Sequence, residues 1–435
     1  MTNDQITKDQ GMTTRKLLRK CSCTVLVFLL FAGRSSVVWA GDWPQILGPH
    51  RNGIANDERL LEKWPAGGPR ELWSRPVGEG YSGAVVVGQT AVIFHRLDDT
   101  ERVEAIDVAN GQRIWKADFE ATYRGGINSD LGPRCTPVLD KATDRVFVYG
   151  AAGDVHCVAL SNGKKLWSRN VRQQYDASDG YFGAGSSPIL AGGNLLINVG
   201  GDTSGAGIVA LAADSGKVTW KATDELASYS SPTLMKVKDQ TCVVFLTRLN
   251  AICVKPSDGK TVLQFPFGRT GPTVNAATPI VFDSHLFVTA SYGIGAKLVK
   301  IDGGSVKPVW ANDEVLSSQY ATCVYSDGYF YGTDGREDAG YSRLRCVEAR
   351  TGKVKWSVDR YSVAHVIIAD EKLLIQRVDG ELVLAKATPT QFEQLASASI
   401  FKATTRAIPA LANGRLLVRS SSGTGDQLKC MQLGR

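Results

Sequence analysis

The 435-residue sequence lacks a long apolar run. Its most hydrophobic stretch, Val25–Gly33, is too short to cross a bilayer as a mature helix, and no other run of about 18 apolar residues occurs. It also lacks a basic block, because its formal charge of +7 is spread over 50 basic and 43 acidic residues. These absences predict a mature chain without a transmembrane segment, and they exclude nucleic acid from the expected partners.

Familiar metal and catalytic motifs are missing as well. The nine cysteines show neither zinc-site nor haem-attachment spacing, and the five histidines are scattered. No nucleophile elbow, phosphate-binding loop or calcium loop stands out. We therefore expect no metal ion and no catalytic residue, and the sequence favours a protein that is not an enzyme.

The first forty residues have the features of an export signal. A basic segment at 15–20 precedes Val25–Gly33, and Val38 and Ala40 stand where small residues precede a signal-peptidase site. Both cysteines of this segment come before the apolar stretch, so a lipoprotein cleavage box is not expected. The absence of paired arginines favours Sec-type export. We predict a signal peptide at 1–40, cleaved after Ala40, and a periplasmic or secreted protein; an uncleaved anchor is the alternative.

Glycine is abundant, and its placement indicates an all-β protein. Many of the 45 glycines lie in short turns between apolar runs. One such turn recurs with a tryptophan behind it, as NGQRIW, NGKKLW, SGKVTW and TGKVKW. The recurrences are roughly 40–50 residues apart, which is the period of a four-stranded propeller blade. We interpret the recurring tryptophans as packing residues, one per blade: Trp73, Trp115, Trp167, Trp220, Trp310 and Trp356.

The repeats amount to eight blades if the two ends of the chain share one blade. The last unit supplies only three strands, near 405–411, 415–420 and 427–433, whereas 71–77 is a spare strand at the beginning. We predict a leader segment at 41–70, followed by an eight-bladed β-propeller of four-stranded antiparallel blades at 71–435. Pairing of the two ends would close the ring and remove its exposed sheet edges. We expect a monomer.

The cysteines fit a role in packing. Seven of them follow residue 40, an odd number, and Cys157, Cys253, Cys346 and Cys430 recur at one place in successive repeats. We interpret these four as small buried side chains. Cys242 and Cys253 are predicted to face each other across a hairpin that turns near 247–248, within reach of a disulfide, although a free pair is favoured.

The units AIDVANGQRIW and CVALSNGKKLW resemble the pyrroloquinoline-quinone (PQQ) type propeller repeat, and the resemblance extends over about 71–435. The leader WPQILGPHRNGI looks like the opening of a large family of exported PQQ-like repeat proteins. This repeat occurs in quinoprotein alcohol dehydrogenases and also in the non-catalytic, BamB-like propellers of outer-membrane protein assembly. The resemblance therefore implies the fold and leaves the activity open.

The two faces of such a propeller are expected to differ. Short turns join the first strand to the second and the third to the fourth, whereas long polar segments, such as 121–134, 172–185 and 332–343, lie on the opposite face. Long glycine-rich loops on a rigid ring are where binding usually resides. We predict that this face binds a protein partner or a small ligand. The predicted lining residues are Tyr123, Arg124, Arg134, Tyr181, Arg269, Asn275, Tyr320 and Arg336.

The leading hypothesis is a binding or scaffold module without catalysis or cofactor, and two alternatives stay open. A PQQ-dependent periplasmic oxidoreductase would require PQQ and Ca²⁺, as the resemblance to the dehydrogenases implies. However, the adjacent cysteine pair and the tryptophan floor of such cofactor sites are not recognisable, and no haem domain is present. The other alternative is a carbohydrate- or peptide-binding propeller.

Overall fold

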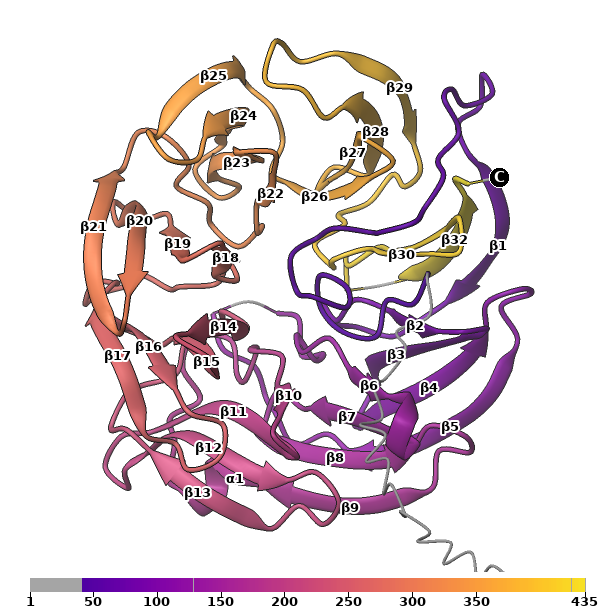
Figure 1. The fold of residues 1–435 in the computed structure, drawn as a ribbon. Helices are drawn as coiled ribbons and strands as arrows, with labels where there is room; N and C mark the ends of the chain where they lie inside the picture. Colours follow the sequence, from indigo (N-terminus) through magenta and orange to yellow (C-terminus); the bar gives the residue numbers. More distant parts are fainter. Residues whose placement is uncertain (1–40, 128, 424, 435) are drawn as a thin grey trace, which may run out of the picture. The chain divides into compact units, whose positions relative to one another are not determined.

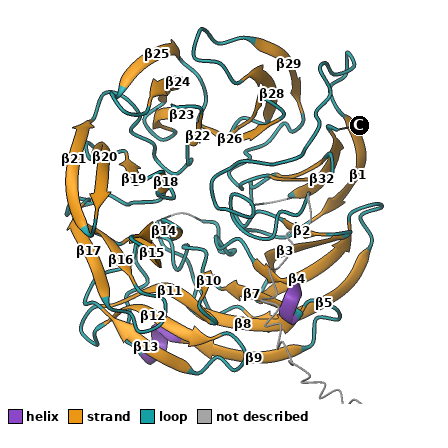
Figure 2. Cartoon of the chain, viewed as in Figure 1, coloured by secondary structure: helices purple, strands orange, loops and turns teal. Residues whose placement is uncertain are grey.

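Antiparallel strands make up nearly all the regular structure of the chain. The computed structural model describes residues 41–127, 129–423 and 425–434, and its strands form eight four-stranded sheets arranged around a ring (Figure 1). The helical elements of these residues are a 3-10 turn at Lys141–Thr143 and the short helix α1, Val171–Gln174 (Figure 2). Neither has the length and apolar character that a membrane-crossing helix needs. The predicted eight-bladed propeller is confirmed.

Blades 1 to 4 follow one another along the chain, and the first strand of each is the innermost. Their strands are β2 (Val85–Val87), β3 (Thr90–Leu97), β4 (Thr100–Asp107) and β5 (Arg113–Glu120); β6 (Val138–Asp140), β7 (Arg145–Tyr149), β8 (Asp154–Ala159) and β9 (Lys165–Asn170); β10 (Ile189–Ala191), β11 (Asn194–Gly201), β12 (Ala206–Ala212) and β13 (Val218–Ala222); and β14 (Thr233–Val237), β15 (Gln240–Leu246), β16 (Asn250–Val254) and β17 (Thr261–Pro266).

Blades 5 to 8 continue the ring in the same way. Their strands are β18 (Ile280–Phe282), β19 (His285–Ala290), β20 (Gly295–Asp302) and β21 (Ser305–Asn312); β22 (Val324–Ser326), β23 (Tyr329–Arg336), β24 (Tyr341–Glu348) and β25 (Lys353–Val358); β26 (Ala364–Ala369), β27 (Lys372–Arg377), β28 (Glu381–Lys386) and β29 (Gln394–Ser399); and β30 (Ala410–Ala412), β31 (Arg415–Arg419), β32 (Gln427–Gln432) and the N-terminal β1 (Arg70–Pro76).

The two ends of the chain close the ring, as predicted. β1 pairs antiparallel with β32, with Arg70 opposite Gln432 and Pro76 opposite Gln427. Proline marks the inner edge of the blades, because β6, β10, β14, β18 and β30 each begin at the residue after a proline. Since proline has no N–H to donate, it suits the position just before a strand starts to pair.

A tryptophan and a glycine join neighbouring blades. The Trp115 indole of blade 1 donates to the Leu160 carbonyl of blade 2 over 2.8 Å. Beneath it lies Gly163, whose φ is +74° and where an added Cβ would fall 2.5 Å from the indole. The same hydrogen bond recurs from Trp73, Trp167, Trp220, Trp310 and Trp356 to the following blade. The recurring turn is therefore part of the interface between blades.

The cysteines after residue 40 are buried free thiols. Cys157, Cys346 and Cys430 each lie opposite the tryptophan of the next strand, and Cys253 lies opposite Leu263. The predicted direct opposition of Cys242 and Cys253 is wrong, because Cys253 pairs with Val244. The hairpin turns between Arg248 and Leu249, one residue later than predicted, and this moves each cross-strand partner by two residues.

The longest connections run between blades. They include residues 121–137, 171–188 and 267–279, whereas the turns from second to third strands are short. The predicted loop at 332–343 is mostly strand, since β23 extends to Arg336 and β24 begins at Tyr341. We call the face that carries the connections between blades the connection face.

Candidate functional site

The leader crosses the inside of the ring. Trp43 is buried and exchanges two 2.8 Å backbone hydrogen bonds with Val86 of blade 1. The carbonyl of Pro44 accepts from Leu139 of blade 2, and Ala55 donates to Ile368 of blade 7. A segment that contacts blades on several sides of the ring must pass through its centre (Figure 1).

Arg51 fastens the leader to the opposite blades. Its side chain is buried, and its guanidinium donates to the carbonyls of Pro232, over 2.8 Å, and of Pro188. Those carbonyls stand at the inner edges of blades 4 and 3. Burial lowers the pKa of Arg51 to about 9. The backbone oxygens satisfy a buried cation that would otherwise be costly.

Above the leader, a cavity of about 760 Å³ lies on the axis, and Ile46 of the leader is one of its lining residues. We call it the axial cavity. Most other lining residues come from the connections between blades, so the cavity belongs to the connection face. The aromatic lining residues are Tyr81, Tyr181, Phe182, Tyr229, Tyr292 and Tyr320. The charged ones are Arg134, Arg336, Glu337, Asp338 and Arg406, with His365 beside them.

An ion pair links a turn of blade 6 to the connection between blades 7 and 8. Arg406, before β30, forks onto Glu337, in the turn between β23 and β24, with N–O distances of 2.6 and 2.9 Å. Tyr320 donates to the same carboxylate over 2.7 Å, and Arg406 bonds the Tyr81 hydroxyl over 3.1 Å. Burial raises the pKa of Tyr320 well above its ordinary value, and Glu337 acts in the same direction. The phenol therefore stays a hydrogen-bond donor.

A second charged pair lies nearby. Arg336 is bound to Asp338, which also accepts from Gln319 over 2.9 Å. The guanidinium of Arg336 lies over the Tyr292 ring, 4.3 Å from its centroid, which is a favourable cation–π distance. The hydrogen bond to Asp338 raises the pKa of Arg336.

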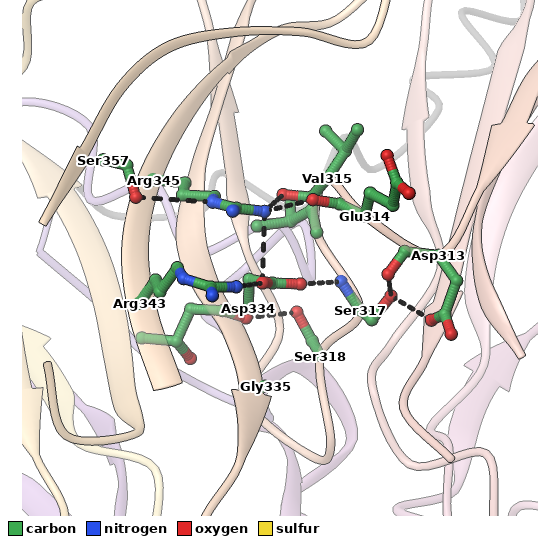
Figure 3. A network of polar contacts seen from close by, with 12 residues as sticks. Asp313, Glu314, Val315, Ser317, Ser318, Asp334, Gly335, Arg343, Arg345 and Ser357 are labelled. Carbon is green, nitrogen blue, oxygen red and sulfur yellow. Dashed lines mark hydrogen bonds and ion pairs between the residues drawn. The ribbon is translucent and has the colours of Figure 1, made fainter. Parts of the chain in front are cut away.

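A polar network holds the connection that carries Tyr320. Figure 3 shows Arg343 and Arg345 of β24 reaching Asp334 from one side while Ser317 meets it from the other. The buried Asp334 carboxylate accepts from the Ser317 amide over 2.8 Å and lies 3.1 Å from Arg345. The hydrogen bond and ion pairs of Asp334 therefore hold blade 6 against the connection that precedes it.

Four of the eight residues predicted for the site meet in the axial cavity. They are Arg134, Tyr181, Tyr320 and Arg336. Tyr123 lies beneath, its ring 5.6 Å from the Arg134 guanidinium.

The other three point elsewhere. Asn275 is fully buried and donates to the Thr247 carbonyl over 2.8 Å, so it fixes the backbone. Arg124 is exposed and pairs with Asp99 over 2.7 Å. Arg269 lies beside Gly293 and does not line the cavity.

Several cavity residues were missed from the sequence, among them Tyr81, Tyr229 and Arg406. They lie in the connections 77–84, 223–232 and 400–409, each of which precedes an inner strand. These connections are shorter than the long segments, such as 121–134 and 172–185, that supplied predicted lining residues. Position just before an inner strand would have been the better signal, because it places a residue beside the axis in most blades.

The cavity does not fit a PQQ and Ca²⁺ site. Neither tryptophan nor cysteine is among its lining residues, so neither a tryptophan floor nor a cysteine pair is available for a flat cofactor. Its three guanidinium groups already pair with carboxylates: Arg134 with Asp130, Arg336 with Asp338 and Arg406 with Glu337. Within residues 41–127, 129–423 and 425–434, no group of three or more His, Cys, Asp or Glu side chains could hold a metal ion.

Comparison with known sequences gives one family. Residues 99–358 match the model described as outer membrane protein assembly factor BamB. The protein of that name from Burkholderia pseudomallei is 25% identical over 303 residues, which cover 59% of this chain and 73% of the relative. The one from Shewanella oneidensis is 27% identical over 104 residues, or 23% of this chain and 26% of the relative.

Solved structures share the fold. BamB from Moraxella catarrhalis superposes with a TM-score of 0.62 at 13% identity, over 84% of this chain and 100% of that one. A europium-containing methanol dehydrogenase superposes with a TM-score of 0.68 at 12% identity, over 91% and 98%. At such identities the likeness concerns the architecture, which serves both catalytic and non-catalytic proteins.

Proposed function

Because this chain belongs to the family of outer membrane protein assembly factor BamB, we propose that it is a non-catalytic scaffold that binds a protein partner in outer membrane protein assembly. The observation that carries the proposal is the axial cavity. Its walls are tyrosine and phenylalanine rings from several blades, and its arginines lie in the pairs Arg406–Glu337, Arg336–Asp338 and Arg134–Asp130. Such a surface offers contact area and hydrogen bonds to a partner.

Aromatic rings with polar tips are enriched in protein interfaces, because they bury much area at little entropic cost. Ile127, which lines the cavity, is 70% exposed and adds apolar contact area to this surface. We infer that an inserted segment of the partner fills the cavity while its flanks rest on the connections between blades.

The proposal also places the protein outside the cytoplasm. The predicted signal peptide, 1–40, lies outside the described residues, and its cleavage after Ala40 stays a prediction. Export to the periplasm fits both this signal and a role in outer membrane protein assembly.

Site-specific photo-cross-linking in intact cells tests the proposal. A photoreactive residue in place of Ile127 should cross-link to an outer membrane protein or to a protein that assembles it. The matched control is Ile114 on the outer strand β5, which is 51% exposed. Equal cross-linking at both positions, or none at Ile127, would contradict the proposal.

An activity assay separates the scaffold from the dehydrogenase alternative. Purified protein given PQQ and Ca²⁺ should show no dye-linked oxidation of alcohols. Turnover that is lost when Arg134 and Arg336 are replaced would overturn the non-catalytic assignment.

A further inference from the structure

A second pocket adjoins the axial cavity. It measures about 350 Å³ and lies between the connections of blades 2, 3 and 4. Tyr181, Gly185, Tyr229 and Val274 line both spaces, so these residues form the wall between them. We call the second space the side pocket.

Arg172 is the charged group at the centre of the argument. It lies on α1 with only 5% of its side chain exposed, and its methylene stem packs over Gly153. Its Nε and Nη1 atoms form no hydrogen bond with any residue that the structure describes. The carboxylate nearest to it belongs to Asp179, 3.8 Å from Nη1, and that side chain is 71% exposed. Arg172 is thus a buried cation with an exposed carboxylate 3.8 Å away, and its Nε and Nη1 donors have no hydrogen-bond acceptor among the described residues.

Two tyrosine hydroxyls near Arg172 also have a hydrogen-bond donor that is not used. The Tyr149 side chain is 1% exposed and lines the side pocket, and its hydroxyl has no hydrogen-bond partner among the described residues. The Tyr229 hydroxyl accepts from the amides of Tyr181 and Phe182, at 2.9 and 2.8 Å, so its own proton is free to be donated. Burial raises the pKa of Tyr149 and of Tyr229, and the charge of Arg172 acts in the opposite direction.

This set of groups needs an acceptor that carries negative charge. Arg172 can only donate, Tyr149 and Tyr229 each have a proton to donate, and a buried donor left unpaired is costly. Carboxylate and phosphate oxygens match the fork of a guanidinium and form charge-assisted hydrogen bonds with it. We propose that the side pocket binds the oxyanion group, carboxylate or phosphate, of a small molecule, with Arg172 and Tyr149 as its donors.

The rest of the side pocket can hold the body of such a molecule. Asn198 and Ser228 line it with polar groups, and Val199 and Leu226 with apolar ones. Its volume lies at the lower end of the usual range for ligand pockets. In contrast, the Arg336 and Arg406 guanidinium groups of the axial cavity already hold carboxylates. Anion binding in the side pocket therefore goes beyond the proposed binding of a protein partner.

Calorimetric titration of the purified protein with sodium acetate, and separately with inorganic phosphate, tests this inference. Chloride keeps the ionic strength constant in both arms. We expect one site per chain for at least one of the two anions, and the arm that binds identifies the class of oxyanion. The proposal would be overturned if neither anion binds with a dissociation constant below 10 mM, which corresponds to a binding free energy of about 3 kcal/mol.

Three variants make the test specific. Arg172→Met keeps the stem over Gly153 and removes the donors, so affinity should fall about 10- to 100-fold, as for the loss of a charged hydrogen bond. Arg169→Met is the matched control, because Arg169 pairs with Gln174 and does not line the side pocket. Should Arg172→Met fail to fold, Tyr149→Phe removes only a hydroxyl and should weaken binding several-fold.

Thermal melting separates a binding role from a structural one. If Arg172 binds an anion, the variant loses the rise in melting temperature that the anion causes, while its melting temperature without anion stays equal or increases. Equal affinity of the wild type, Arg172→Met and Tyr149→Phe would refute the site. Since the titration uses the isolated protein, its outcome does not depend on whether the protein partner is found.

Discussion

At the residue scale, the contact between an indole and the turn glycine of the next blade explains why the repeat has its sequence. The turn must adopt a positive φ, and the indole occupies the space where a side chain would begin, as Gly163 and Trp115 show. The indole N–H also satisfies a turn carbonyl of the next blade. The short recurring sequence therefore specifies both a turn and an interface between blades.

Truncation of Trp115 tests the strength of this contact. Trp115→Ala should lower the free energy of unfolding by about 3–5 kcal/mol, because it leaves a cavity between blades 1 and 2. Gly163→Ala should also destabilise, through steric overlap with the indole and an unfavourable φ. Denaturant titration measures both. A loss below about 1 kcal/mol for Trp115→Ala would show that the interface does not depend on the indole.

Glu101 provides a prediction about pH. Burial raises the pKa of this carboxyl from 4.5 to about 7, although the Ala151 amide donates to it. Between these two pH values the unfolded chain has released the proton that the folded chain keeps. The contribution of Glu101 to the free energy of unfolding therefore falls as the pH rises from about 4.5 to about 7, and it stays low at higher pH.

Glu101→Gln keeps an acceptor for the Ala151 amide and removes the titration. Relative to this variant, the wild type should lose on the order of 3 kcal/mol of stability between pH 4.5 and pH 8. Denaturant titrations across that range measure the difference. Glu120→Gln, at an exposed position on β5, is the control for replacing a glutamate in the same blade. Parallel profiles for wild type and Glu101→Gln would contradict the assignment.

At the scale of elements, β1 is the strand on which closure depends. It is the fourth strand of blade 8, and without it β32 would present an unpaired edge. Replacing Arg70–Pro76 by a glycine–serine linker of equal length keeps the leader attached and removes the pairing. We expect a large drop in melting temperature together with aggregation, since exposed strand edges pair with one another. Light scattering and thermal melting measure these effects; a monomer as stable as the parent would show that the ring does not need β1.

The elements predicted correctly are those that local sequence determines. Turn glycines, the tryptophan behind them and the prolines before inner strands lie within a few residues of the structure they specify, so blade number and closure followed from them. The register of Cys242 and Cys253 failed because a one-residue error in a turn becomes a two-residue error across the hairpin.

The candidate site was less predictable, because its contacts join distant parts of the chain. Glu337 and Arg406 meet because the ring brings the β23–β24 turn of blade 6 close to the connection between blades 7 and 8. The turn of blade 7 that lies between them, 378–380, is short. The passage of the leader through the ring has a similar origin: Arg51 binds carbonyls of two blades that lie more than a hundred residues away. The pattern and spacing of residues in the sequence do not show which distant segments lie close together in the fold.

At the scale of the whole molecule, the proposed function gives the two faces separate tasks. The face of short turns contains the tryptophan interfaces that hold the ring together, and the leader fills its centre. The connection face gathers side chains from most blades around the axial cavity, so a partner bound there would contact several blades at once. Damage to that surface should therefore abolish binding without unfolding the ring.

A pair of double variants tests this separation. Ile127→Asp with Arg336→Glu places new negative charge on the axial cavity, whereas Ile114→Asp with Lys116→Glu makes the same changes of charge on the outer strand β5. Thermal melting of both variants checks that the ring stays folded, because Arg336→Glu also breaks the ion pair with Asp338. In pull-downs of the partner identified by cross-linking, the cavity variant should lose at least tenfold in recovery and the β5 variant should not. Equal recovery by the two variants, or loss only with the β5 pair, would place the binding surface away from the axial cavity.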